Sequence, residues 1–309
     1  MTRPTVILDC DPGHDDAVAI IAAARYCDLL GITAVSGNVG LEHTTRNALV
    51  TTQILGIDTR VHAGADRPLV AERRHAEFIH GASGLDGPDL PTLTRSVAGS
   101  DAVRFIIDTV RSHDRVWLVA VGPLTNVALA LRAAPDLAGR LQGIAIMGGG
   151  LEFGNVTPVA EFNILADPEA ADVVFRADVR RVMAPLDLTH QFLIDEQAIA
   201  RFRAAGSGAG RFVADILDFY GDSYARAFSG RKEGPLHDPC AVLALTHPEL
   251  FERRELNVAI ELRGEHTRGM TVADRRGVRS DLPANTEVLT RIAADRALEL
   301  LLEAAASFD

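Results

Sequence analysis

Four aspartates fall within eight residues near the N-terminus. Asp9 and Asp11 end an apolar run that predicts a strand, and because alternate side chains of a strand share a face, both are expected to point the same way. Asp15 and Asp16 fall in the first turn of the helix predicted to follow, where the helix dipole stabilises a negative charge by about 0.3–1 kcal/mol. Repulsion among close carboxylates exceeds that gain, so a shared proton or a cation must offset it. Ca²⁺ and Mg²⁺ are the cations that carboxylate oxygens prefer.

Two other interpretations of this segment compete with a metal site. An aspartate between a strand and a helix commonly caps the helix and has only a structural role, although four of them favour a cation. An EF-hand calcium loop fits poorly. The sixth and twelfth positions counted from Asp9 are His14 and Ile20, where such a loop needs glycine and glutamate.

Strand and helix patterns alternate along the first two thirds of the chain. Strands are predicted over 5–9, 31–36, 60–63, 115–121, 143–147 and 181–184, and helices over 15–25, 44–55, 101–112, 127–133 and 167–175. This alternation predicts an α/β fold with a mostly parallel, Rossmann-like open sheet flanked by helices. Ligands of such sheets bind at the carboxyl ends of the strands, where Asp11 and Asn38 both lie.

The remaining third is predicted to be mostly helical, with helices over 209–224, 242–245 and 287–305. Two late strands, over 255–262 and 269–273, are candidates for a hairpin. Residues 64–98 form a long irregular loop around His80, and a loop of that length in a compact domain is either functional or disordered. No linker or repeat divides the chain, so residues 1–309 are predicted to form one domain.

Composition narrows the class of protein. The chain has 309 residues, 47% of them apolar, which is enough for a large core, and its net charge of −11 without a basic stripe argues against a nucleic-acid partner. No apolar run is long enough for a membrane span, and the N-terminus lacks the pattern of a signal peptide. Cys10, Cys27 and Cys240 lie in apolar contexts and are expected to be buried free thiols. We therefore expect a cytoplasmic enzyme or binding protein.

The motif Asp9-Cys-Asp11-Pro-Gly-His-Asp15-Asp16-Ala resembles the N-terminal signature of the inosine–uridine preferring nucleoside hydrolases, and the resemblance extends over nearly the whole chain. It implies hydrolysis of the N-glycosidic bond of ribonucleosides with a tightly held Ca²⁺. It also implies a homodimer or a homotetramer.

The resemblance assigns the metal to Asp11, Asp16, Asp238 and the backbone oxygen of Thr125. From the residues alone, Asp238 before a proline and Thr125 at a helix start both indicate helix N-caps. Asp11 is placed to ligate and to act as general base, and His237 to face the leaving base and protonate it as it departs.

The resemblance also assigns a substrate cavity. Its residues are Asp15, Asn38, His80, Met147, Asn155, Glu161, Phe162, Asn163, Tyr220 and Tyr224. Glu161 and Asn163 alternate with apolar residues, which indicates an extended segment facing one cavity. Tyr220 and Tyr224 are one helical turn apart, where core packing is the usual role.

Direct displacement of the base by one water predicts inversion at the anomeric carbon. A haloacid-dehalogenase-like Mg²⁺ phosphatase is an alternative, but Gly13 stands where that class has threonine or valine, and the only lysine is Lys232. A non-catalytic nucleoside-binding protein is a third possibility. Base preference is inosine–uridine-like or pyrimidine, because Trp117 belongs to a predicted core strand and no tryptophan lies near His80.

Overall fold

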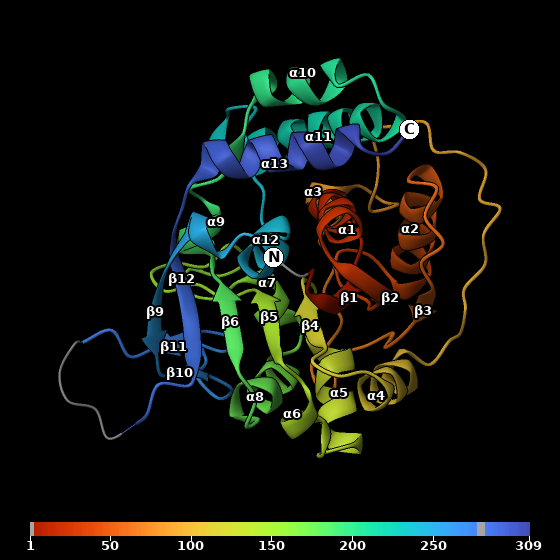
Figure 1. The fold of residues 1–309 in the computed structure, drawn as a ribbon. Coiled ribbons are helices and arrows are strands. Elements are labelled where there is room, and N and C mark those ends of the chain that lie inside the picture. The colour runs from red at the N-terminus through yellow and green to blue at the C-terminus, as the bar shows by residue number, and fades with distance from the viewer. Residues whose placement is uncertain (1–2, 277–281) are drawn as a thin grey trace.

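The computed structural model describes residues 3–276 and 282–309 (Figure 1). Within them an eight-stranded sheet runs in the order β3-β2-β1-β4-β5-β6-β12-β9, and every neighbouring pair is parallel except β12 and β9. Its strands are β1 Thr5–Cys10, β2 Asp28–Ala34, β3 Val61–Ala63, β4 Trp117–Ala120, β5 Gly143–Met147, β6 Arg181–Ala184, β9 Phe251–Leu256 and β12 Thr286–Ile292. The predicted mostly parallel open sheet is confirmed.

Helices cover both faces of this sheet (Figure 1). They are α1 His14–Tyr26, α2 Leu41–Ile54, α3 Glu77–His80, α4 Ala102–Ser112, α5 Thr125–Ala133, α6 Leu137–Arg140, α7 Phe162–Ala166, α8 Pro168–Arg176, α9 Leu186–Thr189, α10 Glu196–Ala204, α11 Gly208–Tyr224, α12 Pro239–Thr246 and α13 Ala294–Ala306. A π-helical turn, η1 Ala225–Ser229, follows α11, and a short 3₁₀ turn, η2 Pro248–Leu250, follows α12.

Strand β1 separates two hydrophobic cores because its side chains alternate between the faces of the sheet. Val6 and Leu8 belong to the core built with α1, α11, α12 and α13, whereas Ile7 belongs to the core built with α4, α5 and α8. All three side chains are fully buried. The chain runs outward from β1 to β2 and β3, and then resumes on the other side at β4. The carboxyl ends of β1 and β4 therefore border the crevice where open α/β sheets bind ligands.

The C-terminal third contains more strand than the sequence predicted. Residues 287–305 do not form one helix: β12 occupies Thr286–Ile292 between β6 and β9, and α13 begins only at Ala294. Val288 and Leu289 are fully buried in this strand, so pairing within the sheet decided the conformation. The predicted strand over 255–262 is divided at Asn257.

Two small sheets complete this part of the chain. Strand β10 Val258–Ile260 pairs antiparallel with β11 Thr271–Ala273, as the predicted hairpin requires, and β7 Leu193–Ile194 pairs with β8 Gly234–Pro235. Cys10, Cys27 and Cys240 are buried free thiols, as predicted. No helix in the described ranges has both the length and the apolar character needed to cross a membrane.

Candidate active site

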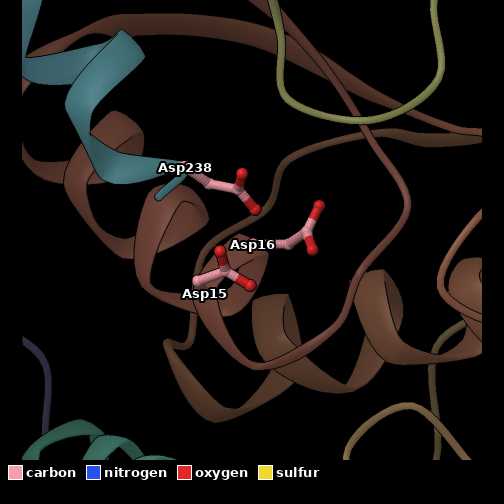
Figure 2. A group of neighbouring side chains, drawn as sticks. All are labelled: Asp15, Asp16 and Asp238. Atoms are coloured by element: carbon pink, nitrogen blue, oxygen red, sulfur yellow. The ribbon is translucent and has the colours of Figure 1, made fainter. Parts of the chain in front are cut away.

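Three buried carboxylates meet at the carboxyl edge of the sheet (Figure 2). Asp15 and Asp16 come from the first turn of α1, and Asp238 precedes α12, a helix that packs directly against α1. One oxygen from each of the three lies within 4.8 Å of the others. The interpretation of Asp238 as an N-cap is correct for its position, but its side chain forms no capping hydrogen bond with the start of α12.

Burial makes the ionised cluster costly without a cation. It raises the pKa of Asp15 to about 7 and that of Asp16 to about 6, and the neighbouring charge of Asp16 adds to the shift of Asp15. Burial and the charges of Asp15 and Asp16 raise the pKa of Asp238 well above its ordinary value. A divalent cation would compensate these charges, so the donor set fits a hard metal ion.

Backbone amides hold the cluster in place. Asp16 accepts hydrogen bonds from the N–H groups of Gly13 (2.9 Å) and Asp11 (3.1 Å), and the side-chain amide of Asn38 donates to it at 3.2 Å. The backbone N–H groups of His237 and Asp238 lower the pKa of Asp15 and so partly offset the effect of burial. The segment before α12 therefore stabilises a charge at the start of α1.

Asp11 lies beside this group but is not a member of it. Its Oδ2 accepts a 2.6 Å hydrogen bond from the N–H of Asn38, and its Oδ1 is a buried atom that has no hydrogen-bond partner in the described part of the chain. A Cβ atom at Gly37 would lie 2.0 Å from Oδ2, and one at Gly122 would lie 2.4 Å from Oδ1. Two glycines therefore leave just enough space for this carboxylate, and its unpaired oxygen has the chemistry of a metal ligand or proton acceptor.

Asp9 has a different role from its neighbours. Its Oδ1 accepts hydrogen bonds from the Thr33 hydroxyl (2.5 Å) and the Asn126 side-chain amide (2.8 Å). These bonds join β1 to β2 and to α5. Asp9 is fully buried and stabilises the packing of the sheet, whereas the cluster is built from the later aspartates.

Thr125 begins α5 and does not cap it. The N-cap residue is Leu124, so the N-cap interpretation of Thr125 is wrong. Its hydroxyl instead donates a 2.7 Å hydrogen bond to Oδ2 of Asp167, a residue that caps α8. The backbone oxygen assigned to the metal by resemblance stays a prediction.

A cavity of about 610 Å³, part of it open to solvent, lies beside the carboxylates of Asp15 and Asp238. All of the residues predicted to bind substrate line it: Asp15, Asn38, His80, Met147, Asn155, Glu161, Phe162, Asn163, Tyr220 and Tyr224. His237 and Asp238 also line it, whereas Asp11, Asp16 and Thr125 do not. The cavity therefore has a polar base beside the cluster and an apolar, aromatic outer part.

Glu161 and Asn163 reach the cavity by a different geometry from the predicted one. The segment is not extended, because Glu161 is the N-cap of α7 and accepts hydrogen bonds from the N–H groups of Gly149 (2.9 Å) and Asn163 (2.8 Å). Burial raises the pKa of Glu161 to about 7. The Asn163 side chain donates to the carbonyl oxygens of Val121 and Met147 at 2.9 and 3.1 Å, which fixes its orientation.

Two histidines of the cavity wall are held by buried partners. Nδ1 of His80 lies 3.0 Å from Nδ1 of His14, whose Nε2 lies 2.9 Å from the carbonyl oxygen of Asp86. Nδ1 of His237 lies 2.7 Å from the Thr189 hydroxyl. Burial lowers the pKa of His80 well below its ordinary value and that of His237 to about 3, so both imidazoles are neutral at neutral pH.

Aromatic residues that sequence reasoning missed complete the outer wall. Phe228 in η1 lies 4.8 Å from Tyr224 and 6.4 Å from Phe78, measured between ring centroids. Phe78 and Phe228 are 61% and 50% exposed and both line the cavity. Tyr220 has two roles, because it is buried in the core, donates a hydrogen bond to the Pro235 carbonyl and also lines the cavity.

The chain is similar over nearly its whole length to proteins of known family. The family model described as "Inosine-uridine preferring nucleoside hydrolase" matches residues 6–299. The chain is 43% identical over 298 residues to the pyrimidine-specific ribonucleoside hydrolase RihB of Escherichia coli, covering 96% of this chain and 95% of that protein.

Solved structures give the same result. A purine-preferring ribonucleoside hydrolase from Gardnerella vaginalis superposes with a TM-score of 0.91 at 33% identity, covering 98% of both chains. The plant nucleoside hydrolase PpNRh1 superposes with a TM-score of 0.92 at 31% identity, covering 99% of this chain and 100% of that one.

Proposed function

The chain belongs to the inosine–uridine preferring nucleoside hydrolase family and is a ribonucleoside hydrolase; we propose that it is a Ca²⁺-dependent enzyme with a preference for pyrimidine ribonucleosides. The observation that carries the proposal is the buried carboxylate cluster beside a cavity lined by polar groups suited to ribose. Family membership removes the support for a haloacid-dehalogenase-like phosphatase and for a non-catalytic binding protein. We treat residues 1–309 as one domain.

The metal would be held by Asp11, Asp16, Asp238 and the backbone oxygen of Thr125. Raised pKa values in the cluster and the unpaired Oδ1 of Asp11 support a hard divalent cation at this position. When bound, Ca²⁺ supplies positive charge that lowers the pKa of a water molecule, although less strongly than zinc does.

Asp11 is the residue that we assign to accept the proton of the attacking water. Its carboxylate is buried, and the N–H of Asn38 fixes one of its oxygens. The other oxygen has no hydrogen-bond partner among the described residues. A base whose position is fixed in this way needs little reorganisation when the reaction begins.

The ribose would be held by Asp15, Asn38, Glu161 and Asn163, whose side chains line the cavity. Breaking the N-glycosidic bond develops positive charge on the sugar, in an oxocarbenium-like transition state. Carboxylates fixed around the ring stabilise that charge. Because one water displaces the base, we expect inversion at the anomeric carbon, and a covalent ribosyl-enzyme would contradict this expectation.

His237 would assist the departing base through a hydrogen bond and not through the predicted proton transfer. Since burial and the neighbouring His190 hold its pKa at about 3, the imidazole is neutral at neutral pH. A neutral imidazole acts as a hydrogen-bond donor to the charge that develops on the base, and the base takes its proton from solvent after leaving.

Two observations support a pyrimidine preference. The identity to the pyrimidine-specific relative is 43%, against 33% to the purine-preferring one. The outer wall of the cavity is built from phenylalanine and tyrosine, and Trp117, the only tryptophan, lies in β4. A broader inosine–uridine preference is the competing outcome of the experiment.

The test is hydrolysis of uridine, cytidine, inosine and adenosine, measured as free ribose. We expect higher kcat/KM for the two pyrimidines, loss of activity after exhaustive chelation, and recovery with Ca²⁺. Faster cleavage of inosine would overturn the base preference alone, and full activity without metal would overturn the role of Ca²⁺. The homodimer or homotetramer and the cytoplasmic location stay predictions, of which light scattering tests the first.

A further inference from the structure

Thr189 contacts the imidazole that faces the leaving base, although no sequence pattern marks it. It is the last residue of α9, it is fully buried, and its Oγ1 lies 2.7 Å from Nδ1 of His237. The same oxygen lies 3.4 Å from the carbonyl oxygen of Leu186. Thr189 therefore has two candidate acceptors for a single hydroxyl hydrogen.

The two contacts of this hydroxyl favour one direction for the bond between Thr189 and His237. Hydrogen bonds from a hydroxyl to an oxygen have heavy-atom distances of about 2.5–3.0 Å, so the 3.4 Å contact with Leu186 is too long for an effective bond. The 2.7 Å contact with His237 fits either direction of the bond. If the ring donated from Nδ1, the hydrogen of the buried Thr189 hydroxyl would have only the long contact with Leu186, so donation from Thr189 to Nδ1 is the arrangement that satisfies both groups. Nδ1 must then be unprotonated, and the single hydrogen of the neutral ring resides on Nε2.

Nε2 is the nitrogen that is available to a ligand. His237 lines the cavity. Within the described residues its Nε2 makes no hydrogen bond, and this atom is not among the buried polar atoms that lack a partner. His190 packs against the ring with a centroid separation of 5.8 Å and so limits its rotation. The hydrogen on Nε2 is therefore directed at the space that the base would occupy.

We propose that Thr189 is a positioning residue that keeps His237 in the tautomer whose Nε2–H can donate to the departing base. This inference rests on the proposed function of His237. The other tautomer would present a lone pair to an atom that is gaining electrons, which is repulsive. No proton is transferred from His237 in this step: the electron pair of the glycosidic bond moves to the base, and the donated hydrogen bond stabilises it.

The test compares two leaving groups in the variants Thr189→Val and Thr189→Ser. Uracil is the poorer leaving group of the two, whereas 4-nitrophenyl riboside releases a phenolate that is stable without help. We expect Thr189→Val to lower kcat for uridine about fivefold, the factor that one ordinary hydrogen bond supplies, with little change in KM. Activity on the nitrophenyl substrate stays within about twofold, and Thr189→Ser restores the wild-type rates because serine keeps the hydroxyl.

Thr52→Val is the matched control, because the Thr52 hydroxyl is also buried on a helix and bonds only a backbone carbonyl, that of Leu49, at 2.9 Å. It should leave both substrates unchanged. Adding Thr189→Val to His237→Ala should cause no further loss on uridine, since Thr189 acts through that ring. An equal loss of kcat on the two substrates in Thr189→Val, or no recovery of kcat in Thr189→Ser, would show that Thr189 serves only for packing.

An NMR experiment tests the role of Thr189 independently of the proposed nucleoside hydrolase activity. ¹⁵N NMR of labelled histidine distinguishes the two neutral tautomers, and we expect His237 to carry its hydrogen on Nε2 in the wild type and to populate both forms in Thr189→Val. A wild-type hydrogen on Nδ1 would overturn the inference even if nucleosides are hydrolysed. Failure to hydrolyse any nucleoside, with the Nε2 tautomer present, would overturn the proposed function alone.

Discussion

The carboxylate of Asp11 and the backbone N–H of Asn38 are joined by a hydrogen bond of 2.6 Å, which connects the end of β1 to the turn after β2. The backbone of Gly37 lies so close to this bond that an added Cβ atom would be 2.0 Å from Oδ2 of Asp11. The position of the proposed base therefore depends on a residue that carries no functional group.

Gly37→Ala should inactivate the enzyme while leaving it folded. The added methyl must displace the Asp11 carboxylate, and a misplacement of about 1 Å can cost about 100-fold in rate. Overpacking should lower the free energy of unfolding by about 1–3 kcal/mol. Steady-state kinetics and urea unfolding measure both effects. Gly139→Ala is the control, because nothing lies within 4 Å of its added Cβ atom. A wild-type kcat in Gly37→Ala would show that the position of the Asp11 carboxylate does not depend on Gly37.

Asp238→Asn should have opposite effects on the metal-free and the metal-loaded protein. Removing one charge from three close carboxylates relieves repulsion, so the melting temperature in chelator should rise above that of the wild type. The same change should abolish the stabilisation by added Ca²⁺, which for the wild type amounts to about 2.7 kcal/mol at a hundredfold excess over Kd. Thermal unfolding with and without Ca²⁺ measures both.

Asp136→Asn provides the comparison for that experiment. Asp136 is an exposed aspartate paired with Arg111 and Arg140 on the surface. Asp136→Asn should keep the full rise in melting temperature that Ca²⁺ causes in the wild type. Only a loss of that rise confined to Asp238→Asn supports the metal site. An unchanged Ca²⁺ shift in Asp238→Asn would mean that the ion binds elsewhere.

Asp9 should make stability depend on pH. Burial raises its pKa from 3.8 to about 7 in the folded protein. Below pH of about 4 both states are protonated, and between pH of about 4 and 7 only the unfolded chain releases the proton, so the free energy of unfolding falls as pH rises. Asp9→Asn keeps a side-chain oxygen that can accept the hydrogen bonds of Thr33 and Asn126. Its free energy of unfolding should fall less between low and high pH than that of the wild type. Urea unfolding at pH 5 and pH 8 measures the difference, and equal slopes would contradict the assignment.

Phe78→Ala should raise KM and spare stability. The ring is 61% exposed and lines the cavity, so its loss removes contact with the base and little core packing. An aromatic contact of about 0.5–1.5 kcal/mol corresponds to a rise in KM for uridine of about twofold to twelvefold. Val70→Ala, at another exposed residue of the same loop (74% exposed), is the control. An unchanged KM would place the base away from this wall.

The sequence predicted the sheet well because its strands are buried runs bounded by glycine, proline and aspartate. It failed at β12, where Val288, Leu289 and Ile292 fit helical as well as extended spacing, and pairing with β6 and β9 decided between them. The cavity residues were found mainly by resemblance, since Glu161 and Asn163 share the cavity through a helix N-terminus and not through the predicted strand.

Other site residues carried no local signal. His14 has no distinguishing pattern between the neighbouring aspartates, although its Nδ1 lies 3.0 Å from Nδ1 of His80, which is distant in the sequence. Thr189 and Phe228 acquire their roles only through partners distant in the sequence, His237 and Phe78 respectively. Residues 225–236, to which no pattern could be assigned, contain the π-helical turn that carries Phe228. Tertiary contacts decide such roles.

The cluster joins Asp16, near the beginning of the chain, to Asp238, which is encoded in its last quarter. During synthesis the sheet strands β1 to β6 emerge from the ribosome well before α12 does. A chain that ends before Asp238 therefore lacks one of the three carboxylates, and we expect it to be inactive even if the sheet has formed. On the proposed mechanism, activity begins only after translation has passed α12.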